Sequence, residues 1–121
     1  MSTGRQNGAL GAYGERVAAR HLVESGLVLL DRNWRCEAGE IDLVLRDGDV
    51  LVFCEVKTRT STAYGHPLEA VDDAKTERLV RLAARWIEEH SVAAPDVRFD
   101  VVAVLTSLRG AAQVEHVRGL G

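Results

Sequence analysis

The chain has 121 residues, which is the length of one domain and enough to bury a core without disulfides or a structural metal. Hydrophobic residues make up 46% and charged residues 27%, as in an ordinary soluble globular domain. Lys and Arg number 15 against 18 Asp and Glu, giving a formal net charge of −3. This balance excludes a strongly basic nucleic-acid-binding chain, but it leaves local basic patches open.

The N-terminal residues contain no apolar stretch typical of a signal peptide. No apolar run approaches the roughly 20 residues that cross a membrane. We therefore expect a reduced, cytoplasmic protein with no membrane partner, in which Cys54 is a small buried hydrophobic residue within a strand.

The first elements are predicted from Gly content and hydrophobic spacing. Residues 1–8 are polar and Gly-rich and indicate a flexible N-terminal arm, followed by a single domain over residues 9–118. Apolar residues at helical spacing predict a helix from Leu10 to about Ser25. An extended segment then begins at Leu27 and runs towards Cys36.

A β-hairpin is predicted next. Residues 41–46 form one strand, Asp47-Gly48-Asp49 has strong turn chemistry, and residues 50–59 form the partner strand.

The remaining elements complete one α/β domain. Residues 60–67 form a polar loop, Pro67 suits the first turn of a second helix ending near His90, and residues 97–105 and 112–117 are strand-like. The predicted order is therefore αβββαββ, with no internal repeats.

The candidate functional residues are charged side chains on the predicted hairpin. Side chains alternate between the faces of a strand, so Glu55 and Lys57 project from the same face. The loop length decides whether Asp42 joins them. A two-residue loop places Asp42 on the Glu55 face, whereas a three-residue loop places it on the other face unless a bulge restores it. We predict the two-residue loop or a compensating bulge.

Two neighbouring carboxylates with a lysine beside them suit a hard divalent cation. Mg²⁺ takes oxygen ligands and is usually held by one or two carboxylates together with water and substrate phosphate. Asp42 and Glu55 are the candidate metal ligands, and Lys57 could position an attacking water or stabilise the transition state. The alternative is a cross-strand salt-bridge cluster on a solvated face.

Six ordered sequence blocks resemble a known family. They resemble the YraN family of endonuclease-like proteins, related to archaeal Holliday junction resolvases within the PD-(D/E)XK nuclease superfamily. The blocks are Gly14-Glu15-x-x-Ala18, Asn33-x-Arg35, Gly39-Glu40-Ile41-Asp42-Leu43, Val52-Phe53-x-Glu55-Val56-Lys57-x-Arg59, Gly65-x-Pro67-x-Glu69-Ala70-Val71 and Arg98-Phe99-Asp100-Val101-Val102.

The resemblance implies a restriction-endonuclease-like fold, a mixed β-sheet flanked by helices, with a Mg²⁺- or Mn²⁺-dependent phosphodiesterase centre. Asp42 and Glu55 would be metal ligands, Lys57 the catalytic lysine and Glu15 an accessory acidic residue. Branched or single-stranded DNA is the favoured substrate, and a homodimer is expected because cutting a two-fold junction needs two centres. The alternatives are a catalytically silent module that binds nucleic acid in repair or recombination, and a purely structural interaction domain.

Several cations and aromatic residues are candidates for nucleic-acid contact. Lys75 and Arg78 belong to a basic stripe on the second helix that continues through Arg81 and Arg85, although a solvated face paired with glutamates is the commoner meaning of such a stripe. Arg59 ends the hairpin, and Tyr64 in the following loop could stack on a base.

Four other residues have simpler expectations. Glu40 is expected at the strand surface or as an acid behind the ligands, Trp34 and Trp86 in the core, and Asp100 in a structural ion pair with an arginine.

Overall fold

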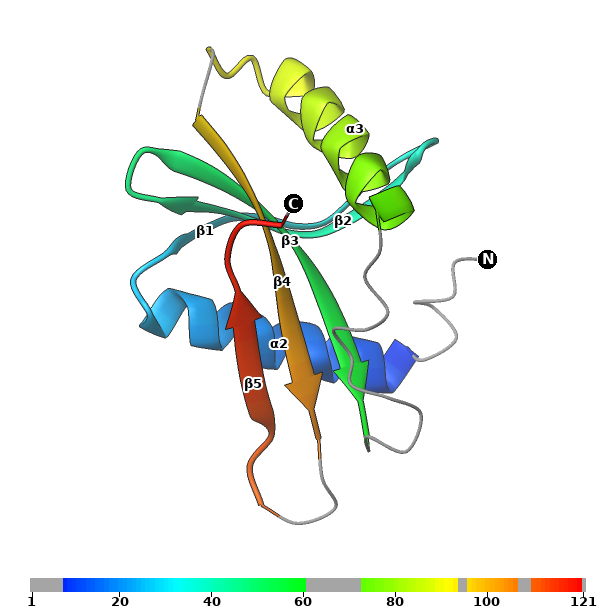
Figure 1. Ribbon diagram of the computed structural model, residues 1–121, viewed down its shortest axis with the longest axis vertical. Coiled ribbons are helices and arrows are strands. Elements are labelled where there is room, and N and C mark those ends of the chain that lie inside the picture. The colour runs from blue at the N-terminus through cyan, green and yellow to red at the C-terminus, as the bar shows by residue number, and fades with distance from the viewer. Residues whose placement is uncertain (1–7, 61–72, 94–95, 107–109, 121) are drawn as a thin grey trace.

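The computed structural model describes residues 8–60, 73–93, 96–106 and 110–120. Among these described residues, two helices and five strands follow one another in the predicted order αβββαββ (Figure 1). They are α2 (Gly8–Glu24), β1 (Val28–Cys36), β2 (Gly39–Asp47), β3 (Val50–Arg59), α3 (Asp73–Glu89), β4 (Asp96–Leu105) and β5 (Gln113–Val117). Residues 1–7 of the expected arm and Pro67 lie outside the described residues.

The strands form one mixed sheet in the order β1-β2-β3-β4-β5. Strands β3 and β4 pair in parallel, and the other neighbouring pairs are antiparallel. Since parallel neighbours need a long crossover connection, the chain between β3 and β4 includes helix α3. The predicted mixed sheet flanked by helices is confirmed.

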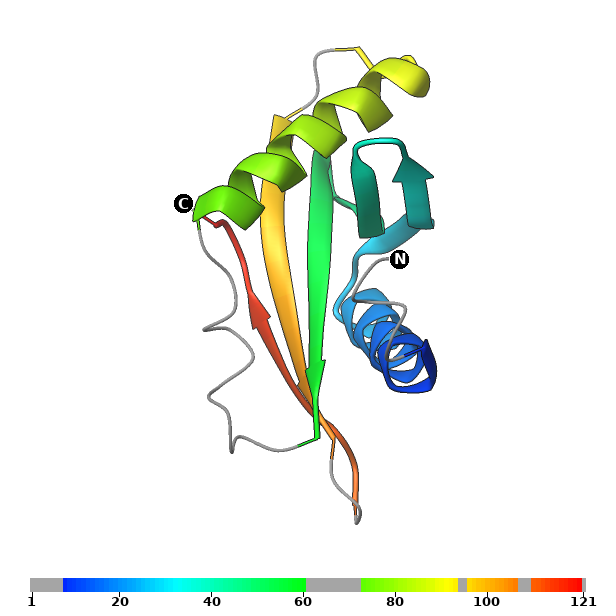
Figure 2. The ribbon, with the colours of Figure 1, turned by 90° about the vertical axis from the view of Figure 1, so that its right-hand side faces the viewer.

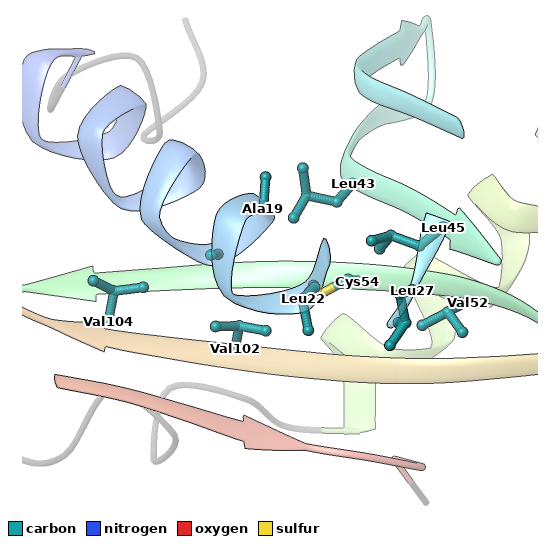
Figure 3. Close-up of a cluster of buried hydrophobic side chains, with 10 residues drawn as sticks. Ala19, Leu22, Leu27, Leu43, Leu45, Val52, Cys54, Val102 and Val104 are labelled. Carbon is teal, nitrogen blue, oxygen red and sulfur yellow. The ribbon is translucent and has the colours of Figure 1, made fainter. Parts of the chain in front are cut away.

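The two helices cover opposite faces of the sheet (Figure 2). Successive β3 side chains separate accordingly, because Val52 and Cys54 join the cluster under α2 while Leu51 and Phe53 join the cluster under α3. Figure 3 shows the α2 cluster, in which Leu22 lies against the sheet. The expected burial of Cys54 is confirmed, and both cysteines are free.

The cluster under α3 contains the aromatic residues. Trp86 is buried there, with its ring edge-on to Phe53 at a centroid distance of 5.7 Å. Trp34 packs against the same cluster but is only partly buried, because it lies on the edge strand β1.

Asp100 is fully buried and ties the C-terminal part of the chain together. Arg98 donates two hydrogen bonds to it, as the sequence predicted for an arginine, while His116 Nε2 lies 2.7 Å away and the Gly119 amide donates a further bond. Burial alone would raise the pKa of Asp100, but the hydrogen bonds outweigh it and hold that pKa below its ordinary value.

The two described helices were compared with the length and hydrophobicity of a membrane-spanning helix. Neither α2 nor α3 is long and apolar enough to cross a membrane.

Candidate metal centre

The candidate centre lies where β2 parts from β3. Their ladder runs from Asp47↔Val50 to Leu43↔Cys54, around the two-residue loop Gly48-Asp49. The predicted two-residue loop is therefore confirmed. The next position of the same register places Asp42 across from Glu55.

The side chain of Asp42 accepts a backbone hydrogen bond at the point where the β2–β3 ladder ends. Its Oδ2 atom accepts a hydrogen bond of 2.8 Å from the amide of Val56 on β3. A carboxylate thus replaces a strand carbonyl as the acceptor for this amide, which keeps the β3 donor satisfied while β2 bends away.

Burial raises the pKa of Asp42 to about 7 from its ordinary value of 3.8. The hydrogen bond from Val56 opposes this increase, whereas the negative charges of Glu15, Glu55 and Glu40 add to it. Asp42 therefore lies in an acidic region to which α2, β2 and β3 all contribute. A divalent cation would relieve both the burial penalty and the repulsion.

Glu55 and Lys57 lie side by side on β3. Lys57 Nζ is 3.0 Å from Glu55 Oε2, and both side chains are about one-fifth exposed. The contact lacks hydrogen-bond geometry, so the buried Oε2 atom accepts no hydrogen bond. The Lys57 ammonium offsets the charge of this oxygen, and a metal ion is another cation that could do so.

Glu15 comes to the centre because α2 packs closely on β3. The preceding residue, Gly14, is buried, and a Cβ atom built on it would overlap the side chain of Thr58. Only glycine allows this approach of helix and strand.

Asn33 on β1 joins the acids from the other side. Its Nδ2 donates to Glu15 Oε1 at 2.8 Å and to Glu40 Oε2 at 3.4 Å, and Arg35 Nε also lies 3.4 Å from the latter atom. Glu40 contacts Asn33 and Arg35, and its negative charge acts on Asp42. Asn33 had no predicted role, although asparagine is depleted in strands and its presence within β1 is a usable signal.

The donor set fits Mg²⁺ or Mn²⁺ better than a metal that needs a full protein cage. Within residues 8–60, 73–93, 96–106 and 110–120, no group of three or more His, Cys, Asp or Glu side chains is placed to hold an ion. Asp42 and Glu55 supply at most two carboxylates, and Mg²⁺ is commonly bound in this way with water completing its shell.

The predicted nucleic-acid contacts are only partly brought to this region. Arg59 ends the same strand as Glu55 and is partly buried. Lys75 and Arg78 lie on α3, which packs on the sheet face that carries Leu51 and Phe53 and, by strand alternation, Glu55 and Lys57. Tyr64 lies outside the described residues. Arg85 of the basic stripe bonds Glu37 in the β1–β2 turn, and Glu88 on α3 adds a further electrostatic attraction.

Comparison with known proteins gives one family. The model of a family described as "Uncharacterised protein family UPF0102" matches residues 14–104. A UPF0102 protein of Nocardioides sp. (strain ATCC BAA-499 / JS614) is 66% identical over 113 residues, covering 93% of this chain and 91% of that protein. A UPF0102 protein of Beutenbergia cavernae is 62% identical over 117 residues, covering 97% and 99% respectively.

Proposed function

The chain belongs to UPF0102, and its sequence blocks resemble the YraN family. Because Asp42 also interacts electrostatically with Glu55, which lies beside Lys57, we propose that the chain is a metal-dependent nuclease. The reaction is hydrolysis of phosphodiester bonds in DNA, with branched or single-stranded substrates favoured. The observation that carries the proposal is that the buried Asp42 carboxylate interacts electrostatically with Glu55, whose Oε2 lies 3.0 Å from Lys57 Nζ.

Asp42 and Glu55 would hold Mg²⁺ or Mn²⁺. The bound ion would polarise a phosphoryl oxygen and lower the pKa of a water molecule. Asp42 is fixed for this role by the Val56 amide, and its second oxygen remains for the ion. Glu55 offers the oxygen that accepts no hydrogen bond.

Lys57 would act on the reacting groups. Its ammonium lies 3.0 Å from Glu55 Oε2, so it is next to the proposed ion. From there it donates a hydrogen bond to the attacking water or to a phosphoryl oxygen as negative charge develops. Glu15 would add a ligand or orient the water.

The wider proposal concerns partners and location. We propose that four residues contact the phosphate backbone or the bases, namely Arg59, Tyr64, Lys75 and Arg78. The preferred nucleic acid is DNA rather than RNA. The protein would act in the cytoplasm, as a homodimer on two-fold junctions. The second candidate is a catalytically silent module that binds nucleic acid. It is favoured by the ion pair of Lys57 with Glu55, which can be purely structural.

A cleavage assay tests the proposal. The purified chain is incubated with labelled junction, flap, single-stranded DNA and RNA substrates in Mg²⁺, Mn²⁺ or EDTA, beside Glu55→Gln and Lys57→Ala. We expect metal-dependent cleavage that falls by about a hundredfold or more in both variants. Arg46→Gln is the matched control, because it removes an exposed cation at the hairpin end of β2.

The outcomes separate the candidates. Nucleic-acid binding without cleavage, unchanged by Lys57→Ala, would support the silent module. A chain that binds neither nucleic acid nor metal would refute both.

A further inference from the structure

Asn33 occupies an unusual place in the sheet. Its backbone φ is +52°, a left-handed conformation that asparagine tolerates better than most residues. The β1–β2 register pairs Arg32 with Leu43 and Trp34 with Ile41, so Asn33 lies across from Asp42. It is thus the β1 residue next to the proposed ligand.

The amide of Asn33 connects acids from two elements. Its Nδ2 atom carries two N–H donors, and these reach Glu15 on α2 and Glu40 on β2. Carboxylates can only accept, so the contacts fix the orientation of the amide. The shorter bond, 2.8 Å, goes to Glu15.

A neutral donor is well suited to this position. Glu15, Glu40 and Glu55 all act on Asp42 through their negative charges, so these acids also repel one another. A lysine or arginine at position 33 would hold Glu15 too, but it would compete with a bound cation. Arg35 cannot replace the amide, because it contacts Glu40 from a side chain that is 59% exposed.

We propose that Asn33 is a positioning residue of the metal centre: its amide holds the Glu15 carboxylate beside Asp42 against the repulsion of the other acids. This inference rests on the proposed function, because the role of Glu15 belongs to it. Asn33 touches neither metal nor substrate and acts through Glu15.

A double-mutant cycle on Mn²⁺ affinity tests the inference. Calorimetry measures Mn²⁺ binding to the unaltered chain, Asn33→Gly, Glu15→Gln and the double variant. Glycine at position 33 allows the left-handed backbone and removes the amide. We expect each single variant to weaken Mn²⁺ binding about tenfold, and Glu15→Gln to cost little more once the amide is gone.

Two further variants serve as a control and as a replacement for Asn33→Gly. Arg35→Gln is the matched control, since it removes a contact to Glu40 and leaves Glu15 in place. If Asn33→Gly does not fold, Asn33→Ala removes the donor without adding a charge, at a modest backbone cost in the left-handed region, and the same loss of coupling to Glu15 is expected.

The failures are distinguishable. If Glu15→Gln weakens Mn²⁺ binding equally with and without Asn33, or not at all, the positioning role is wrong while the Asp42–Glu55 centre stands. If the unaltered chain binds no Mn²⁺, the proposed function fails and this inference fails with it.

Discussion

The charge of Asp42 should destabilise the folded chain at neutral pH, and Asp42→Asn should relieve this. Burial is the main reason that the pKa is raised to about 7 in the fold, against an ordinary value of 3.8. Asparagine keeps the shape, and its Oδ1 atom can still accept the Val56 hydrogen bond. The substitution therefore removes the charge with little other change.

The magnitude follows from proton linkage. Between about pH 4 and pH 7 the folded chain binds a proton at Asp42 that the unfolded chain has lost, so stability falls as pH rises through this window. Above pH 7 the penalty is complete, and a pKa difference of about three pH units corresponds to roughly 4 kcal/mol. Below about pH 4 both states are protonated and the penalty disappears.

Urea unfolding in EDTA, followed by tryptophan fluorescence across this pH range, measures the effect. We expect Asp42→Asn to be more stable than the unaltered chain by up to about 4 kcal/mol at pH 8 and nearly equal to it at pH 4. Glu24→Gln, which removes an exposed carboxylate of α2, should change stability by about 0.5 kcal/mol or less. A variant that is less stable than the parent at pH 8, or a difference independent of pH, would refute the reasoning.

Three other predictions concern packing and the C-terminal network. Asp100→Asn should lower the free energy of unfolding by about 3 to 5 kcal/mol in urea titrations, because it leaves buried donors without a charged partner. The unaltered chain should lose the stability contributed by the Asp100 carboxylate as pH falls below about 4. Gly14→Ala should cost about 1 to 3 kcal/mol through overlap with Thr58, and Thr58→Ala in the same chain should recover part of the loss in thermal unfolding. Ending the chain after Val117 removes the Gly119 donor and should cost about 1 kcal/mol or more, so an unchanged melting temperature would contradict the role given to this bond.

Local patterns in the sequence predicted much of the fold. The turn residues Asp47-Gly48-Asp49 predicted the hairpin, whereas the two-residue loop was expected because Asp42 and Glu55 had to share a face. The arginine partner of Asp100 also followed, since a buried acid needs a cation.

Contacts between distant residues could not be predicted in this way. The bond from Val56 to Asp42 exists only because the β2–β3 ladder stops at Leu43, and no local pattern marks where strands part. The bridge from Asn33 to Glu15 depends on how closely α2 lies on the sheet. The sequence pattern marked the charged residues of the proposed centre but not Asn33, the neutral residue that contacts two of its acids.

The bond between the Val56 amide and Asp42 gives this centre a spectroscopic reporter of its own. A backbone N–H that donates directly to a carboxylate changes its nuclear magnetic resonance frequency when that carboxylate gains a proton or a cation. One cross-peak in a ¹⁵N–¹H spectrum would thus follow protonation and metal binding at Asp42 without any substitution. Its neighbours on β3, which bond to backbone carbonyls, would serve as the internal reference.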